Sequence, residues 1–191
     1  MLRLSFRQTD EQGVGVNVMN SLAQNKLRRL WQRDDLVHFT TRYSRKPTAQ
    51  PVDRLAAILR DGLVAPAASA DGSVCSDLSI LAEGMAVPYD SLVFLHRFGD
   101  QSFIYTISAP GRFGVFVEPS LPVITPQDLA PNWVVLCRDE VYVKERVAAE
   151  KFIALVVHPD DAQAVLTEFQ SELERLALPL YLYDGTVVWP S

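Results

Sequence analysis

The strongest constraint on the fold is a series of short strand-like segments, separated by turns and followed by one long amphipathic helix. Gly-Asp and Ala-Pro-Gly-Arg signals mark turns between successive segments. The predicted strands are 36–41, 91–96, 102–108, 114–118, 133–137, 140–143 and 152–157, of which 133–137 and 140–143 are one longer strand or two staggered ones. The helix is predicted over 160–178, where apolar residues recur at helical spacing. This pattern predicts an α+β fold with antiparallel strands.

Weaker sequence patterns predict the remaining elements of the chain, which we expect to form a single domain. They predict helices over 20–31 and 52–60, a long loop over 65–88 with a short helix near 77–81, and a terminal hairpin over 180–189. Gly62 is expected to end the second of these helices. No linker or repeat divides the chain, so we expect one domain over 1–191, with 1–33 as an N-terminal extension and 159–191 as the C-terminal helix and hairpin.

Composition limits the class of protein. The chain has 191 residues, of which 48% are hydrophobic, and this is enough to bury a core without disulfides or a structural metal. The two cysteines, Cys75 and Cys137, lack the spacing of a zinc site or a disulfide framework, and we expect both to be reduced. No apolar segment reaches the length that spans a bilayer. We therefore expect a cytoplasmic protein with no membrane partner and no bound metal.

Charge argues against non-specific binding to nucleic acid, because the formal net charge is -5 and such binding depends on neutralising phosphates. Two clusters of basic residues nevertheless occur, at 26–33 and 42–46. Each is either a solvated surface or a local basic patch.

Familiar catalytic motifs are absent from the sequence. It contains no Gly-rich phosphate loop, nucleophile elbow or His-Glu-x-x-His motif. The three histidines, His38, His96 and His158, are far apart, so any site must be assembled by folding. A nucleophile formed by Cys75 with His96 is a rival hypothesis, although nothing in the sequence indicates a lowered thiol pKa.

Two segments resemble a known family. Leu-Val-His-Phe-Thr-Thr at 36–41, followed by a helix that ends in Ile-Leu-Arg-Asp-Gly-Leu at 58–63, is similar to the opening of ADP-ribosyltransferase-fold proteins. The DarT-type DNA ADP-ribosyltransferases and their abortive-infection relatives show this arrangement. Downstream, Asp-Glu-Val-Tyr-Val at 139–143 and the core strand at 152–157 resemble the glutamate strand of that family and the strand that follows it.

The resemblance implies a fold, a substrate and two principal residues. The fold would be an α+β domain with a split core of two antiparallel sheets and flanking helices, with NAD between the sheets. His38 would donate a hydrogen bond to a ribose of NAD, and Thr40 or Thr41 would offer a hydroxyl. Glu140 would steady the positive charge that grows as the nicotinamide-ribose bond breaks. For both His38 and Glu140, an ordinary structural or solvent-facing role is an equal alternative.

Two further positions of the family pattern are harder to match. Tyr89 is the first candidate for the residue on the middle strand that would contact nicotinamide, with Ser76 and Tyr105 behind it, although Pro88-Tyr89-Asp90 is also an ordinary turn. Arg42 is our candidate for binding the NAD pyrophosphate, against a surface role. Arg45 and Arg60 are alternatives for the family arginine.

The function implied by the resemblance is transfer of ADP-ribose to a macromolecule, which is DNA, RNA or protein. A toxin or defence effector of this kind would imply an antitoxin or immunity partner. The main alternative is a non-catalytic binding module on the same or another α+β scaffold, since fold alone does not establish activity. An RNA 2′-phosphotransferase-like activity is a third reading, which would need several basic residues around the cleft.

Overall fold

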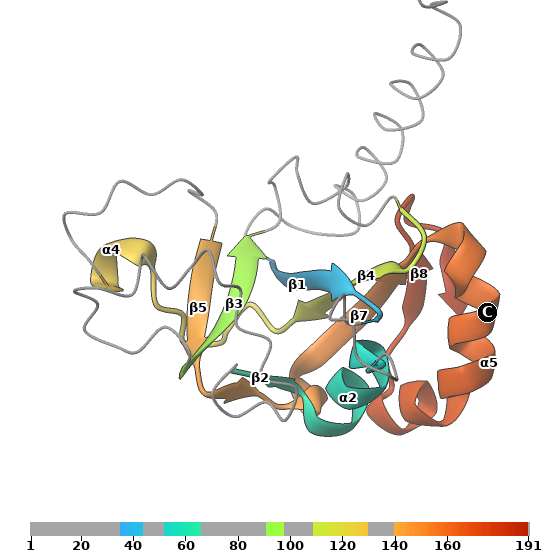
Figure 1. The fold of residues 1–191 in the computed structure, drawn as a ribbon, viewed down its shortest axis with the longest axis horizontal. Coiled ribbons are helices and arrows are strands. Elements are labelled where there is room, and N and C mark those ends of the chain that lie inside the picture. Colours follow the sequence, from blue (N-terminus) through green and yellow to red (C-terminus); the bar gives the residue numbers. More distant parts are fainter. Residues whose placement is uncertain (1–34, 44–51, 66–90, 98–108, 130–139, 191) are drawn as a thin grey trace, which may run out of the picture.

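A computed structural model describes residues 35–43, 52–65, 91–97, 109–129 and 140–190 of the chain. Its strands form a seven-stranded sheet in the order β5-β3-β1-β4-β7-β8-β9 and a separate two-stranded sheet, β2-β6 (Figure 1). The seven strands are β1 (Leu36–Thr41), β3 (Leu92–Arg97), β4 (Arg112–Val117), β5 (Glu140–Lys144), β7 (Phe152–Val157), β8 (Leu180–Leu182) and β9 (Val187–Trp189). The short pair is β2 (Leu63–Val64) and β6 (Arg146–Val147).

Two of the helices cover one face of the sheet, and a third lies beside its edge strand β5. They are α2 (Arg54–Asp61), α4 (Pro126–Leu129), the 3₁₀ turn η4 (Ala149–Lys151) and α5 (Pro159–Leu176). Figure 1 shows α2 and α5 beside each other near β4, β7 and β8, whereas α4 lies beside β5. The mixed α+β class predicted from the sequence is confirmed.

The described strands depart from the expected pair of antiparallel sheets. Most neighbours are antiparallel, but β7 and β8 are parallel, and the large sheet is continuous from β5 to β9. The reason is α5, whose 18 residues span about 27 Å and carry the chain back along the sheet before β8 begins. The predicted terminal hairpin is present as β8 and β9, and it extends the sheet instead of standing apart.

The helix α2 begins two residues later than the predicted 52 and ends at Gly62, as predicted. Asp53 caps it, because its Oδ1 accepts hydrogen bonds from the backbone N–H groups of Leu55 and Ala56. Gly62 ends it at φ 83° and ψ -173°, a conformation that essentially only glycine adopts. A Cβ atom at Gly62 would lie 2.2 Å from the carbonyl oxygen of Val147, so glycine is also required for space.

The helix α5 covers the core with one face. Its buried residues are Ala162, Val165, Phe169 and Leu173. His158 caps its start, where Nδ1 accepts from the N–H of Asp160, and Ala177 ends it in the left-handed conformation. The helix predicted over 160–178 is confirmed within two residues at each end.

Most of the described core lies between the sheet and these two helices. Leu36, Val115 and Leu155 face the helices and pack in one cluster with Leu59 and Val165. On the other face of the sheet a smaller apolar cluster is built on Val37, Phe116, Ala154 and Val156. The alternation of neighbours such as Leu36 and Val37 between the clusters follows from the two-residue period of a strand.

Several predicted segments lie outside the described residues. They are the helix over 20–31, the loop over 65–88 with its short helix, and the strands over 102–108 and 133–137. The other predicted strands are present, and 36–41 and 152–157 have the predicted bounds. None of the described helices has both the length and the apolar character needed to cross a membrane.

Candidate functional site

The strand β1 is paired over its whole length on one side and over only part of it on the other. Its register with β4 covers six residue pairs, from Leu36 to Thr41. Its register with β3 covers two pairs, Leu36 with Arg97 and Val37 with His96. The two strands therefore part after Val37, and the polar half of β1 begins at this point, which we call the β1–β3 fork.

His38 is the first residue beyond the fork, and its ring bonds to the strand that β1 has left. Its Nδ1 lies 2.9 Å from the backbone carbonyl oxygen of Phe94. A carbonyl only accepts hydrogen bonds, so Nδ1 carries the proton. The imidazole thereby holds β1 and β3 together where their backbones no longer do.

The electrostatic surroundings keep this ring neutral. Burial is the largest effect and lowers the pKa of His38 below its ordinary value of 6.5, and the electrostatic interactions with His96 and Arg54 lower it further. The bond to the Phe94 carbonyl opposes them without reversing the shift. A neutral ring with its proton on Nδ1 presents Nε2 as an acceptor. Because its one proton is donated to Phe94, the neutral ring has no second N–H for the hydrogen bond that His38 was expected to donate to a ribose hydroxyl, and any hydrogen bond at Nε2 would be an accepted one.

Glu140 is the first residue of β5 and lies directly opposite His96 on β3. It is partly buried, and this burial raises the pKa of its carboxyl above the ordinary value of 4.5. A hydrogen bond from the side chain of Tyr142 acts in the opposite direction and favours the ionised form. Glu140 is thus neither a solvated surface carboxylate nor a core residue.

His38 and Glu140 lie on neighbouring parts of the sheet without touching. Only β3 separates their strands, which puts them about 10 Å apart across two strand spacings. Strand alternation places Glu140 on the face of Val37 and His96, and His38 on the other. A single ligand that contacted both would have to cross the sheet at the β1–β3 fork.

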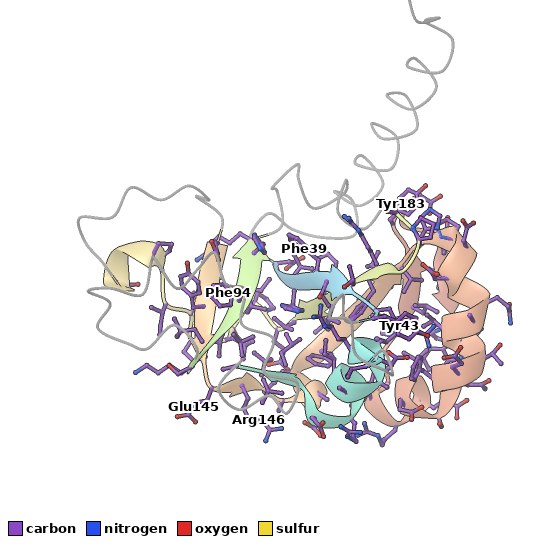
Figure 2. All side chains as sticks on the ribbon, viewed as in Figure 1. Phe39, Tyr43, Phe94, Glu145, Arg146 and Tyr183 are labelled. Atoms are coloured by element: carbon purple, nitrogen blue, oxygen red, sulfur yellow. The ribbon has the colours of Figure 1, made fainter. Side chains whose placement is uncertain are left out.

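Aromatic rings flank the fork on the Glu140 face. The ring of Phe39 lies 4.5 Å from that of His96, and Phe94 meets Tyr142 edge to face at 5.0 Å. Figure 2 shows Phe39 on the side of β1 away from α2, with Phe94 on the adjoining β3. His96, which the sequence offered only as a partner for Cys75, therefore stands next to Glu140.

On the helix side of the fork, a cation meets the hydroxyl groups of β1. Arg54, the first residue of α2, donates from Nη1 to the Oγ1 atoms of Thr40 and Thr41, at 3.2 and 3.3 Å. It is close enough to His38 to influence the pKa of that ring. Sequence reasoning did not select Arg54. A basic residue in the first turn of a helix opposes the helix dipole, and this could have singled it out.

Arg42, the predicted pyrophosphate ligand, is occupied elsewhere. Its side chain is buried and donates to Asp53 from Nε and Nη2, at 3.1 and 2.9 Å, and to Glu168 from Nη2. Its guanidinium also lies 5.1 Å from the ring of Tyr43 and 5.2 Å from that of Phe169. Arg42 thus joins the end of β1 to the cap of α2 and to α5, which is neither a ligand contact nor the expected surface role.

The remaining sequence candidates divide into two groups. Arg60 is exposed and pairs with Asp61 at the last turn of α2, away from the fork. Ser76, Tyr89 and Tyr105, together with Arg45 and Cys75, lie outside the described residues. Within the described ranges, no group of three or more His, Cys, Asp or Glu side chains is arranged to hold a metal ion.

Comparison with known proteins gives no relative. No protein-family model matches the chain, and no curated protein or solved structure is significantly similar to it.

Proposed function

We propose that this protein is an NAD-dependent mono-ADP-ribosyltransferase that modifies a macromolecule. The observation that carries the proposal is the strand order β5-β3-β1, in which the strands of Glu140 and His38 flank one common strand. Residues 102 positions apart in the chain are thereby brought within about two strand spacings. That common strand follows directly after the segment that contains Tyr89, the candidate for the middle position.

In this proposal NAD crosses the sheet at the β1–β3 fork, and His38 positions it from the face opposite that of Glu140. The Nδ1 bond to Phe94 fixes the ring, and Nε2 accepts a hydrogen bond from a ribose hydroxyl of the substrate. The low pKa of the imidazole keeps it an acceptor at neutral pH. Thr40, on the same face of β1, adds a hydroxyl group to the same region.

Glu140 acts on the bond that breaks. The bond between ribose C1′ and the nicotinamide nitrogen is cleaved, and nicotinamide leaves with the electron pair. A nucleophilic atom of the acceptor then bonds to C1′ and releases its proton. The partly buried carboxylate of Glu140 stabilises the positive charge that develops on the ribose, and the weak local screening strengthens this attraction.

The experiment that tests the proposal measures nicotinamide release and label transfer from NAD labelled in its adenylate phosphate. Single-stranded DNA, RNA and a mixture of proteins serve as acceptors. Glu140→Gln should abolish both signals. Glu145→Gln is the matched control, because Glu145 is exposed and follows the other end of β5 (Figure 2). Equal activity of wild type and Glu140→Gln would remove Glu140 from the mechanism.

Binding of NAD separates the enzyme from the alternative of a non-catalytic module. A ligand at about 100 times its dissociation constant stabilises a folded protein by roughly 2.7 kcal/mol, which a thermal melt detects. If millimolar NAD leaves the melting temperature unchanged, the proposal of an NAD-dependent enzyme fails.

A further inference from the structure

We infer that Tyr142 is a positioning residue for Glu140, whose hydroxyl holds the carboxylate in one orientation and leaves carboxylate acceptor sites for the substrate. The inference rests on the proposed function, since it explains how Glu140 is aimed at the ribose of NAD. It also goes beyond the family resemblance, which gave no role to Tyr142.

The first step is the face that the two side chains share. In the register of β5 with β3, Glu140 lies opposite His96 and Tyr142 lies opposite Phe94. Residues two positions apart on a strand point to the same face. The Tyr142 hydroxyl donates a hydrogen bond to the Glu140 carboxylate. A tyrosine has one proton to donate, so the two oxygens of the carboxylate keep acceptor sites for a ligand.

The second step is the fixed position of Tyr142. Its N–H donates to the carbonyl of Ile124, and its carbonyl accepts from the N–H of Ile124, both at 2.8 Å. Both backbone groups therefore point away from β3, which makes Tyr142 and Phe94 the closer, non-hydrogen-bonded kind of antiparallel pair. Tyr142 is 2% exposed, and its ring meets that of Phe94 edge to face at 5.0 Å. The phenol is thus held by its backbone and by its ring.

The third step connects this pair to the other principal residue. The ring of Phe94 packs against Tyr142, while the backbone carbonyl of Phe94 accepts the Nδ1 proton of His38 at 2.9 Å. One residue of β3 therefore supports His38 directly and Glu140 through Tyr142.

The fourth step is the charge of Glu140. Burial raises the pKa of its carboxyl, and the Tyr142 hydroxyl lowers it, because a donated hydrogen bond stabilises the ionised form. The ionised form is the one that stabilises positive charge on the ribose. The other described titratable side chains on this face of β3 and β5, or on the adjoining α4, are His96, Lys144 and Asp128.

The test removes only the hydroxyl group. Tyr142→Phe keeps the buried ring, and Tyr183→Phe is the matched control, because Tyr183 follows β8 in the other half of the sheet (Figure 2). NMR of protein that carries carboxyl-labelled glutamate measures the pKa of Glu140, and Glu140→Gln identifies its signal. This pKa should rise in Tyr142→Phe and stay unchanged in Tyr183→Phe.

Nicotinamide release from NAD gives the second readout. Loss of one hydrogen bond to a charged group should lower kcat of Tyr142→Phe roughly 10-fold or more, with the KM for NAD close to that of wild type. The increase of kcat with pH, as Glu140 loses its proton, should occur at higher pH in this variant. Tyr183→Phe should match wild type in both respects.

The outcomes separate the inference from the proposed function. Wild type that releases no nicotinamide would end both. Active wild type, with Tyr142→Phe unchanged in kcat and in the pKa of Glu140, would overturn the positioning role alone. A loss of kcat that is equal at every pH, with an unchanged pKa of Glu140, would show that Tyr142 only supports the fold and would also overturn the inference.

Discussion

The Nδ1 atom of His38 donates a hydrogen bond to the carbonyl of Phe94, 2.9 Å away on the strand from which β1 has just separated. A side chain thus replaces the backbone ladder at the fork. This hydrogen bond requires a proton on Nδ1, whereas burial of the ring opposes the second proton that would give it a charge, and the effect of that second proton on stability can be measured.

Stability should fall on acidification because of His38. The unfolded chain takes up a proton at this residue near pH 6.5, whereas the folded protein does so only at lower pH, so acidification through this window favours unfolding. Urea denaturation at several pH values between 5 and 8 gives the free energy of unfolding as a function of pH. The slope of this free energy against pH should be smaller for His38→Gln than for wild type, and the Gln amide can still donate to the Phe94 carbonyl. Equal slopes for the two proteins would contradict a lowered pKa.

Glu140 should make the opposite contribution. Its pKa is higher in the folded protein than the ordinary 4.5, so its contribution to stability is present below that value and lost as the pH rises through the folded pKa. At pH 7, Glu140→Gln should therefore melt at the same temperature as wild type or above it, while losing activity. A melting temperature several degrees lower would show that the carboxylate supports the fold.

Removing Arg42 should destabilise the protein strongly. Arg42→Gln leaves Asp53 without its cation and breaks the link to α5, which should cost on the order of 2–4 kcal/mol. Glu168→Gln should cost less than about 1 kcal/mol, because the Glu168 side chain is 50% exposed. Chemical denaturation of both variants checks this order. Similar losses of unfolding free energy in Arg42→Gln and Glu168→Gln would refute the central role of Arg42.

Gly62 and Gly111 form a matched pair of glycines with positive φ. A Cβ at Gly62 would meet the Val147 carbonyl at 2.2 Å, whereas a Cβ at Gly111 has nothing within 4 Å. Gly111→Ala should cost only the backbone strain, about 1–2 kcal/mol. Gly62→Ala should exceed this by at least about 2 kcal/mol, since the β6 backbone must also move. If the two variants have the same denaturation midpoint, the backbone of β6 moves at little cost in free energy.

The elements that could be predicted are those with a local signal. The bounds of 36–41 and 152–157 follow from continuous apolar or β-branched composition, and the end of α2 follows from Gly62. The parallel pairing of β7 and β8 was missed, because it depends on where α5 returns the chain. The two-residue strands β2 and β6 carry too few residues to show any periodicity.

Only part of the candidate site could be predicted from the sequence. His38 and Glu140 were selected by resemblance, and nothing local could show that their side chains lie on opposite faces of the sheet. Arg42 was selected because arginine suits phosphate, yet the carboxylate of Glu168 that occupies it lies 126 residues further along the chain. Arg54 was missed because its relation to Thr40 and His38 exists only once α2 packs beside β1.

The position of β1 in the sheet determines when the fork can form during synthesis. Both of its neighbours, β3 and β4, follow it in the chain, and the carboxylate that holds Arg42 belongs to α5 near the C-terminus. A ribosome therefore synthesises the first half of the chain before His38 can meet Phe94, and most of the second half before Arg42 can meet Glu168. Fragments cut between β1 and β3 would each lack half of the fork, and only their reassociation would restore it.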